Sequence, residues 1–214
     1  MKKHITKIIM LSLCFFGTTF NICAQEIEKS EIHSILEVQQ YERAIHIMAM
    51  LLIGFGFLMV FVKKYGRSAL TATFLLVSVS VPAYLAIKGM CVFENKNEIE
   101  QLILAEFGAA SLLISAGALL GRIKMYQYLI LGLLFIPFYM LNEIIVINDY
   151  FHFIGKVADT GGSIVIHAFG AIFGISAAVF LTTKEHIETP IMSDATTDKY
   201  SLLGSMALWV FWPS

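Results

Sequence analysis

The chain has 214 residues, of which 57% are hydrophobic and 14% are charged, and its mean hydropathy is +0.75. A typical soluble domain is about half apolar and about a quarter charged, so this composition excludes an ordinary soluble protein and indicates an integral membrane protein. The formal net charge of −1 provides no excess of positive charge for nucleic acid, and we expect a lipid bilayer as the surroundings.

The first 24 residues have the layout of a secretory signal peptide. A positively charged start precedes an apolar run over residues 8–20, and Ala24 suits the last position before a cleavage site. Ile22 is bulky for the position two before that site, so an uncleaved anchor helix is the alternative. In either case, the polar residues 25–40 are predicted to lie outside the cell membrane.

Apolar segments then follow one another, separated by polar breaks. A helix of about 20 apolar residues spans the hydrocarbon core of a bilayer. We therefore predict an all-α, polytopic membrane bundle with spans at 43–62, 68–89, 101–120, 125–147 and 160–183. A sixth segment, 201–214, is short for a span, so we expect a bundle that is truncated after five to six helices.

The charged residues in the breaks predict the orientation of the spans. Basic residues gather in the first, third and fifth breaks, at Lys63, Lys64, Arg67, Arg122, Lys124, Lys184 and Lys199. The second break is mainly acidic, with Glu94, Glu98 and Glu100. Because cytoplasmic loops of membrane proteins are enriched in Lys and Arg, the odd breaks are predicted to face the cytoplasm. The mature N-terminus is then outside, in a multi-pass protein of the inner or plasma membrane.

The fifth predicted span opens with DTGGSIVIHAFG, residues 159–170, and contains a histidine. At the helical rise, His167 lies about 12 Å along the helix from Asp159, near the bilayer centre. A histidine is costly at this depth unless it faces a cavity or a partner. Two roles stay open from the residues alone: a hydrogen-bonding or proton-handling group in a narrow pore, and a packing residue bonded to a neighbouring helix.

Asp159 and Phe107 are two further candidates. Asp159 stands where the fifth span begins, and a carboxylate there satisfies free amides and matches the helix dipole. A second and compatible role for Asp159 is to hold the mouth of a cation site. Phe107 follows Glu106 in the third span, where a ring can block a pore against water and can favour a cation. Simple packing is the more frequent role of such a ring.

Small residues let helices approach one another closely in lipid. We expect helix packing at the glycines of the first and fifth spans, which are Gly54, Gly56, Gly161, Gly162, Gly170 and Gly174. The last two have GxxxG spacing. Glu143, on the fourth span, is predicted to be a buried structural acid or an interfacial residue.

The chemistry-bearing residues point away from an enzyme. The six histidines are scattered along the sequence, which has no metal-ligand spacing, phosphate-binding glycine loop or nucleophile elbow. We therefore expect no metal, no cofactor and no catalytic residue.

Five segments resemble, in order, motifs of the Rhesus (Rh) branch of the ammonium transporters. They are IHIMAMLLIGFGFLMVFVKKYGRSAL, LAEFGAASLLISAGALLG, LNEII, DTGGSIVIHAFGAIFG and SLLGSMALWVFWPS. The resemblance covers residues 41–214, and several separate motifs in the expected order are a more specific signal than one GxxxG.

The resemblance implies an ammonium transporter fold that assembles as a homotrimer, with one pore per subunit between two halves of inverted topology. His167 corresponds to the first of the paired pore histidines, and Phe107 to one of two stacked phenylalanines of the outer gate. Asp159 corresponds to the acid that supports the outer recruitment site. The second phenylalanine is expected directly after FWPS, where the sequence stops at Ser214, and the second histidine on a helix of the other half. The chain is therefore expected to be the N-terminal half only.

The function implied by the resemblance is ammonium or ammonia transport through a Rh-type channel. Ammonium would be recruited outside and lose a proton, and neutral ammonia would cross the apolar pore, because desolvating the ion costs far more free energy. Carbon dioxide is the alternative solute. Two other hypotheses concern an N-terminal half: a product that conducts nothing unless the C-terminal half is supplied in trans, and a half-subunit that regulates full-length trimers.

Overall fold

The computed structural model describes residues 32, 34–63, 66–90, 97–147, 158–183 and 192–211. The predicted signal peptide and its cleavage site lie outside the described residues. The chain divides into two compact units, residues 1–42 and 43–214. The second unit contains nearly all of the described residues and the whole of the candidate site.

Every regular element in the described ranges is a helix, as predicted. Five helices are long and apolar enough to span a membrane: Ser34–Phe61, Gly66–Met90, Glu98–Gly117, Met125–Val146 and Thr160–Leu181. The first ends with a π-helical segment η1 (Met50–Phe55), α2 (Gly56–Leu58) and a 3-10 turn η2 (Met59–Phe61). The next three are α3 (Gly66–Met90), α4 (Glu98–Gly117) and α5 (Met125–Val146). The fifth comprises η3 (Thr160–Gly162), η4 (Ser163–Ala168) and α6 (Phe169–Leu181), and α8 (Ala195–Phe211) follows.

Two of these helices begin six or more residues before the predicted spans. The first starts at Ser34 rather than at residue 43, so part of the polar segment 25–40 is helical. α8 starts at Ala195 rather than at residue 201, because Asp194 caps it: Asp194 Oδ1 accepts hydrogen bonds from the amides of Thr196 and Thr197, both at 2.9 Å.

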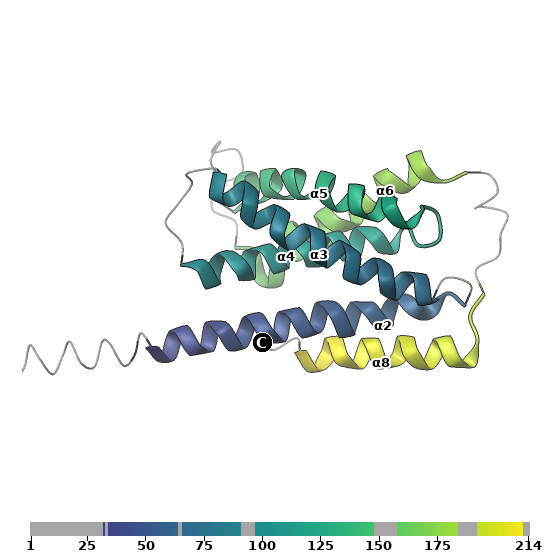
Figure 1. Cartoon of the computed structure of the whole chain (residues 1–214), viewed down its shortest axis with the longest axis horizontal. Coiled ribbons are helices and arrows are strands. Elements are labelled where there is room, and N and C mark those ends of the chain that lie inside the picture. Colours follow the sequence, from purple (N-terminus) through teal and green to yellow (C-terminus); the bar gives the residue numbers. More distant parts are fainter. Residues whose placement is uncertain are drawn as a thin grey trace, which may run out of the picture. The chain divides into compact units, whose positions relative to one another are not determined.

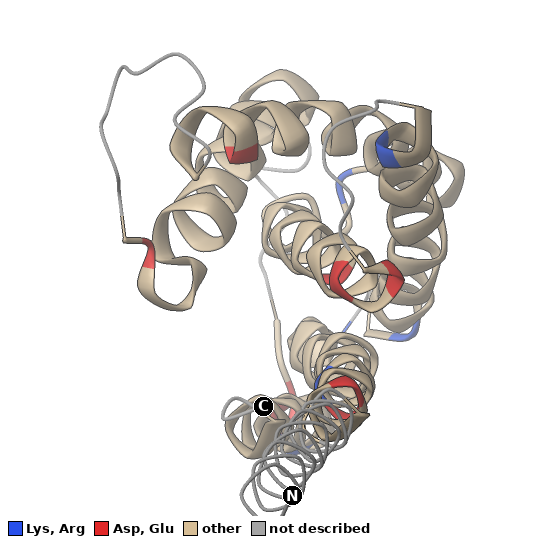
Figure 2. Ribbon diagram, turned by 90° about the vertical axis from the view of Figure 1, so that its left-hand side faces the viewer, with Lys and Arg blue, Asp and Glu red and all other residues tan. Residues whose placement is uncertain are grey.

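The core lies around α4. In the 18-residue window that defines each span, 67% of the residues of α4 are buried, against 17% for Thr160–Leu181. α4 contacts α3, α5 and α6, whereas α8 contacts η1, α2 and η2 and runs beside them in Figure 1. Figure 2 shows that most of the helical ribbon carries no charged residue. This arrangement fits helices that contact lipid and each other rather than water.

The turn between α4 and α5 explains how two antiparallel spans are joined by so few residues. Gly121 has a φ of 72°, which L side chains rarely adopt. Arg122, the next residue, donates a hydrogen bond of 2.6 Å from Nη1 to Thr182 Oγ1, just beyond the end of α6. The turn therefore fixes the ends of α4, α5 and α6 together.

Candidate functional site

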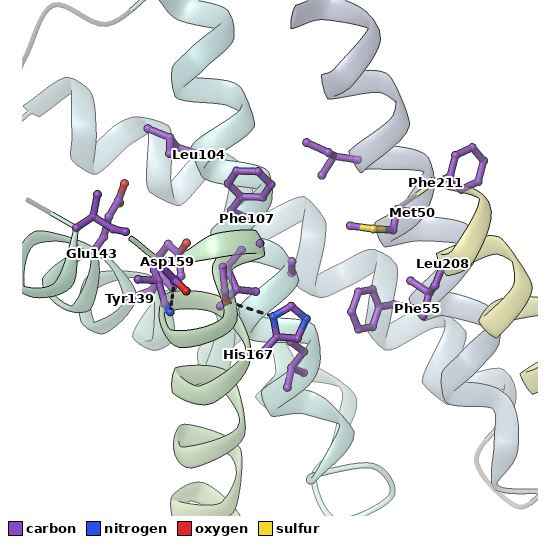
Figure 3. A pocket seen from close by; sticks show the side chains of 18 residues that line it. Met50, Phe55, Leu104, Phe107, Tyr139, Glu143, Asp159, His167, Leu208 and Phe211 are labelled. Carbon is purple, nitrogen blue, oxygen red and sulfur yellow. Dashed lines mark hydrogen bonds between the residues drawn. The ribbon is translucent and has the colours of Figure 1, made fainter. Parts of the chain in front are cut away.

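The candidate site is a cavity of about 500 Å³ in the unit of residues 43–214. Its walls come from η1, α4, α5, the start of the fifth span and α8. Figure 3 shows Phe107, Asp159 and His167 on one side, and Met50, Phe55, Leu208 and Phe211 on the other. The lining is mostly apolar, and its ionisable residues are Asp159, Glu143, Tyr139 and His167. Three residues singled out in the sequence, His167, Asp159 and Phe107, therefore share one cavity.

Asp159 holds the start of the fifth span. Its Oδ1 accepts hydrogen bonds from the hydroxyl of Ser163 at 2.8 Å and the amide of Ile164 at 2.9 Å. Its Oδ2 accepts one from the amide of Val165 at 2.9 Å. Burial alone would raise the pKa of this carboxyl, but these hydrogen bonds to the charged form prevail, and the pKa is lowered from its ordinary value. Asp159 is therefore a helix cap, and its carboxylate still lines the cavity.

Two glycines make this cap possible. Gly161 and Gly162 have φ angles of 69° and 66°, in the left-handed region that favours glycine. A Cβ on Gly162 would also collide with the side chain of Ile166. The sequence predicted these two glycines as helix-packing positions. The structure gives them a backbone role instead: they turn the chain so that the amides of η4 point back at Asp159.

His167 lies on η4, where its side chain is exposed to the cavity. Its Nδ1 is 3.2 Å from the carbonyl oxygen of Gly162. A carbonyl only accepts hydrogen bonds, so of the two neutral tautomers this contact fits the one with the proton on Nδ1. In that tautomer, Nε2 is the nitrogen that carries the lone pair.

Aromatic rings line the cavity that this imidazole also lines. Phe107 of α4 and Phe55 of η1 line the cavity from different helices, and both are partly buried. Behind the wall, Phe135 stacks against Tyr139 with ring centroids 6.1 Å apart, and Phe169 and Phe173 pack edge-on against Phe135. Rings packed in this way hold the shape of a wall more firmly than flexible aliphatic chains do.

Glu143 and Glu106 are the two carboxyl groups buried in the spans. Glu143 lines the cavity, and its Oε2 accepts a 2.7 Å hydrogen bond from the Tyr84 hydroxyl. Glu106 is 1% exposed, and its Oε2 has no hydrogen-bond partner among the described residues. Of these two acids, only Glu143 lines the cavity. The sequence left its role open, and its partner Tyr84 on α3 was not anticipated.

The other glycines lie at close helix contacts. A Cβ on Gly170 would be 2.6 Å from the Ser111 carbonyl oxygen, and one on Gly174 would be 2.8 Å from Ser115 Cα, so α6 approaches the backbone of α4. A Cβ on Gly54 would be 2.6 Å from the Leu208 side chain, and one on Gly56 would be 2.9 Å from that of Leu70. These four glycines thus face neighbouring helices.

The sequence did not reveal the polar residues that hold η4 or the second wall of the cavity. Asn142 and Ser111 bond backbone carbonyls of η4, and Met50, Phe55, Leu208 and Phe211 complete the lining. Asn142 and Ser111 have no local sequence signal, because each bonds a segment far along the chain. The wall formed by the other four residues could be found only from the contact of α8 with η1.

The fold and the cavity define a multi-pass membrane protein with an internal, mostly apolar site. The chain belongs to the Ammonium Transporter Family, whose sequence model matches residues 6–214.

Its relatives place it in the Rh branch, as the sequence motifs indicated. It is 34% identical over 176 residues to the ammonium transporter Rh type C of Bos taurus, covering 79% of this chain and 37% of that protein. It is 34% identical over 181 residues to the ammonium transporter Rh type A of Rattus norvegicus, covering 82% of this chain and 39% of that protein.

A solved structure of Nitrosomonas europaea Rh50, described with the mechanism of conduction by the Rhesus family of channels, has a similar fold. The TM-score is 0.79 and the identity 46%, over 82% of this chain and 47% of that one. The chain thus spans less than half the length of each of these three proteins.

Proposed function

We propose that this chain forms one wall of a Rh-type pore that conducts ammonium or ammonia across the membrane. The observation that carries the proposal is the shared cavity, in which His167, Phe107 and the Asp159-capped turn meet. The printed names and titles of the relatives, as ammonium transporters and conducting channels, support the choice of solute.

The cavity suits a small solute that changes its charge. Glu143 and Asp159 place carboxyl groups in the lining, where a cation is favoured. The remaining wall is largely apolar, so desolvation disfavours the ammonium ion there and admits neutral ammonia. With the proton of His167 on Nδ1, Nε2 accepts a hydrogen bond from an ammonia N–H. No covalent bond is made or broken between heavy atoms, so the proposed function is not that of an enzyme.

We further propose that the residues of a second half close the other side of the pore and that complete subunits form a trimer. The predicted spans and the extracytoplasmic N-terminus belong to the same proposal. Contacts among the basic breaks support a common side for them: Lys63 lies 3.5 Å from Asp194, and Arg122 bonds Thr182. The first, third and fifth breaks thus lie at ends of spans that contact one another.

A conduction assay in proteoliposomes tests the proposal. The chain is reconstituted by itself and together with the segment of Nitrosomonas europaea Rh50 that it does not cover, and the internal pH is followed after an inward ammonium gradient. We expect a rapid internal rise of pH with the two segments together. His167→Ala should abolish this rise, and His46→Ala is the matched control because His46 does not line the cavity.

Each outcome separates the hypotheses. A rise that is unchanged in His167→Ala would refute the pore role of His167. A rise with this chain by itself would refute the need for a second half. Rapid internal acidification under a carbon dioxide gradient, without a response to ammonium, would identify carbon dioxide as the solute. No response to either gas with both segments present would favour the non-conducting or regulatory hypotheses.

A further inference from the structure

The wall that carries His167 is a π-helical segment, η4 (Ser163–Ala168). Such segments are uncommon, contain one more residue per turn than an α-helix prefers, and shift the hydrogen-bond ladder by one residue. The shift is visible at its end. The amide of Phe169 bonds the carbonyls of Ile164 and Ile166, whereas in a regular α-helix it would bond the carbonyl of Val165.

Asn142 reaches the carbonyl that the Phe169 amide does not use. Its Nδ2 donates a hydrogen bond of 3.1 Å to the carbonyl oxygen of Val165. Asn142 is on α5, one residue before Glu143, and its side chain is partly buried. An amide in this environment provides a partner for a carbonyl that would otherwise lack a full share of hydrogen bonds.

Ser111 holds the next carbonyl along the chain. Its hydroxyl donates a hydrogen bond of 2.8 Å to the carbonyl oxygen of Ile166, and the serine is fully buried on α4. The residue after Ile166 is His167. Two consecutive carbonyls directly before the imidazole are thus bonded by side chains from two different helices, while Asp159 bonds the amides of Ile164 and Val165.

We propose that Ser111 and Asn142 are positioning residues that keep η4 in its π-helical form and so direct the imidazole of His167 into the cavity. The inference rests on the proposed function, because it assigns these residues a purpose in the same pore. Without the two donors, the π-turn would relax toward an α-helix and rotate His167 about the helix axis. Neither residue needs to touch the solute.

Ser115 provides a matched control. It is also a fully buried serine on α4, and its hydroxyl donates a hydrogen bond of 2.7 Å to the carbonyl of Gly170. Gly170 lies in α6, beyond η4. Ser115→Ala therefore removes the same kind of bond between the same two spans without touching the segment that carries the imidazole.

The test compares Ser111→Ala, Asn142→Leu and Ser115→Ala in the reconstituted two-segment protein. Solid-state nitrogen NMR of labelled histidine reports the tautomer of His167, with the signal assigned by its loss in His167→Ala. We expect Ser111→Ala and Asn142→Leu to lower the Nδ1–H share of His167 and to reduce conduction at least about tenfold, the scale found when residues that orient a functional histidine are removed. Ser115→Ala should leave the His167 signal unchanged.

Failure of this inference is distinguishable from failure of the proposed function. An unchanged His167 spectrum in both Ser111→Ala and Asn142→Leu would overturn the positioning role, whatever the conduction. A shift of the His167 signal of the same size in Ser115→Ala would also overturn the positioning role. The signal would then respond to the loss of any hydrogen bond between α4 and the fifth span. If His167→Ala conducts normally, the proposed pore role of His167 fails, although the NMR comparison still decides whether the two residues position the ring. Should Asn142→Leu not assemble, Ser111→Ala decides the test, because it removes one oxygen and adds nothing.

Discussion

The cavity is bounded by two π-helical segments that are held in different ways. η4 is held by hydrogen bonds: Asp159 bonds its amides, and Ser111 and Asn142 bond its carbonyls. η1 has the sequence MLLIGF and is held by close packing, with Gly54 against Leu208 of α8. A Cβ on Gly204 of α8 would in turn collide with the backbone of Leu58 and lie 2.7 Å from the carbonyl oxygen of Gly54.

Hydrogen bonds and close packing give these two walls different roles in the cavity. Hydrogen bonds have defined directions, so the wall of η4 can fix the orientation of a polar ring such as His167. Packing of apolar groups is non-directional and sets how close two helices come. The wall of η1 therefore determines the width of the cavity, and the wall of η4 determines its chemistry.

The largest effect should come from filling a backbone contact between α6 and α4. In Gly174→Ala, the new methyl group would lie 2.8 Å from both Cα and the carbonyl oxygen of Ser115, which are backbone atoms that cannot move aside. We expect the free energy of unfolding to fall by about 1–3 kcal/mol, as for other overpacked interiors. Unfolding in mixtures of SDS and a mild detergent, followed by circular dichroism, measures this change.

Gly54→Ala is the corresponding change in the wall of η1. Its methyl group would lie 2.6 Å from Cδ2 and 2.9 Å from Cγ of Leu208, and this side chain lines the cavity and can turn toward it. We expect a loss below about 1 kcal/mol, because the higher helix propensity of alanine offsets part of the contact. Gly89→Ala, with no atom within 4 Å of the new methyl group, is the control and should be neutral or stabilising. A loss in Gly54→Ala as large as in Gly174→Ala would mean that the Leu208 side chain cannot move aside.

An effect smaller than that of Gly174→Ala is expected at the charged caps, and it depends on pH. The pKa of Asp159 is lowered in the folded chain, so the unfolded chain binds the proton more tightly and the stabilisation is present above the unfolded pKa of about 3.9. It is lost as pH falls through the lower pKa of the folded state. We expect Asp159→Asn to cost about 1 kcal/mol at neutral pH and to show a weaker loss of stability between about pH 5 and pH 3.

Asp194 is the comparison for this prediction, because it caps α8 beside η1. Its pKa is also lowered, mainly by the hydrogen bond from the Thr197 amide and against the opposing effect of burial. Asp194→Asn should also destabilise the chain at neutral pH and weaken the loss of stability at acidic pH, but it should leave the His167 NMR signal unchanged. If Asp159→Asn also leaves that signal unchanged, the cap of η4 does not contribute to the orientation of the imidazole.

The sequence was sufficient for the fold, because span length and polarity are properties of contiguous residues. The apolar runs predicted five spans, and the described part of the chain contains five helices of that character. It was also sufficient to name Asp159 and His167, which share the cavity, since an acid and a histidine stand out in an apolar stretch. Phe107, the third, was singled out by the resemblance to the family. Their roles in conduction stay predictions.

What the sequence did not show depends on contacts between distant segments. Ser111 bonds a carbonyl 55 residues away and Asn142 one 23 residues away, and neither pairing has a periodic or local pattern. The glycine pair was interpreted as packing because small residues usually pack in lipid, whereas the positive φ angles follow from the turn around Asp159. The early start of α8 did have a signal: Asp194 followed by Ala-Thr-Thr is a capping sequence within a polar stretch.

The smallest effect should come from the exposed ion pair beside the wall of η1. Lys63 Nζ lies 3.5 Å from Asp194 Oδ2, with the two side chains 61% and 36% exposed. Water and salt screen such a pair, so Lys63→Met should change the free energy of unfolding by only about 0–0.5 kcal/mol, and less at high salt. The backbone bond from the Lys63 amide to the Met192 carbonyl, at 2.9 Å, does not depend on this side chain. A loss above about 1 kcal/mol that disappears in 1 M salt would mean that charge, rather than the contact of Gly54 with α8, holds the wall of η1.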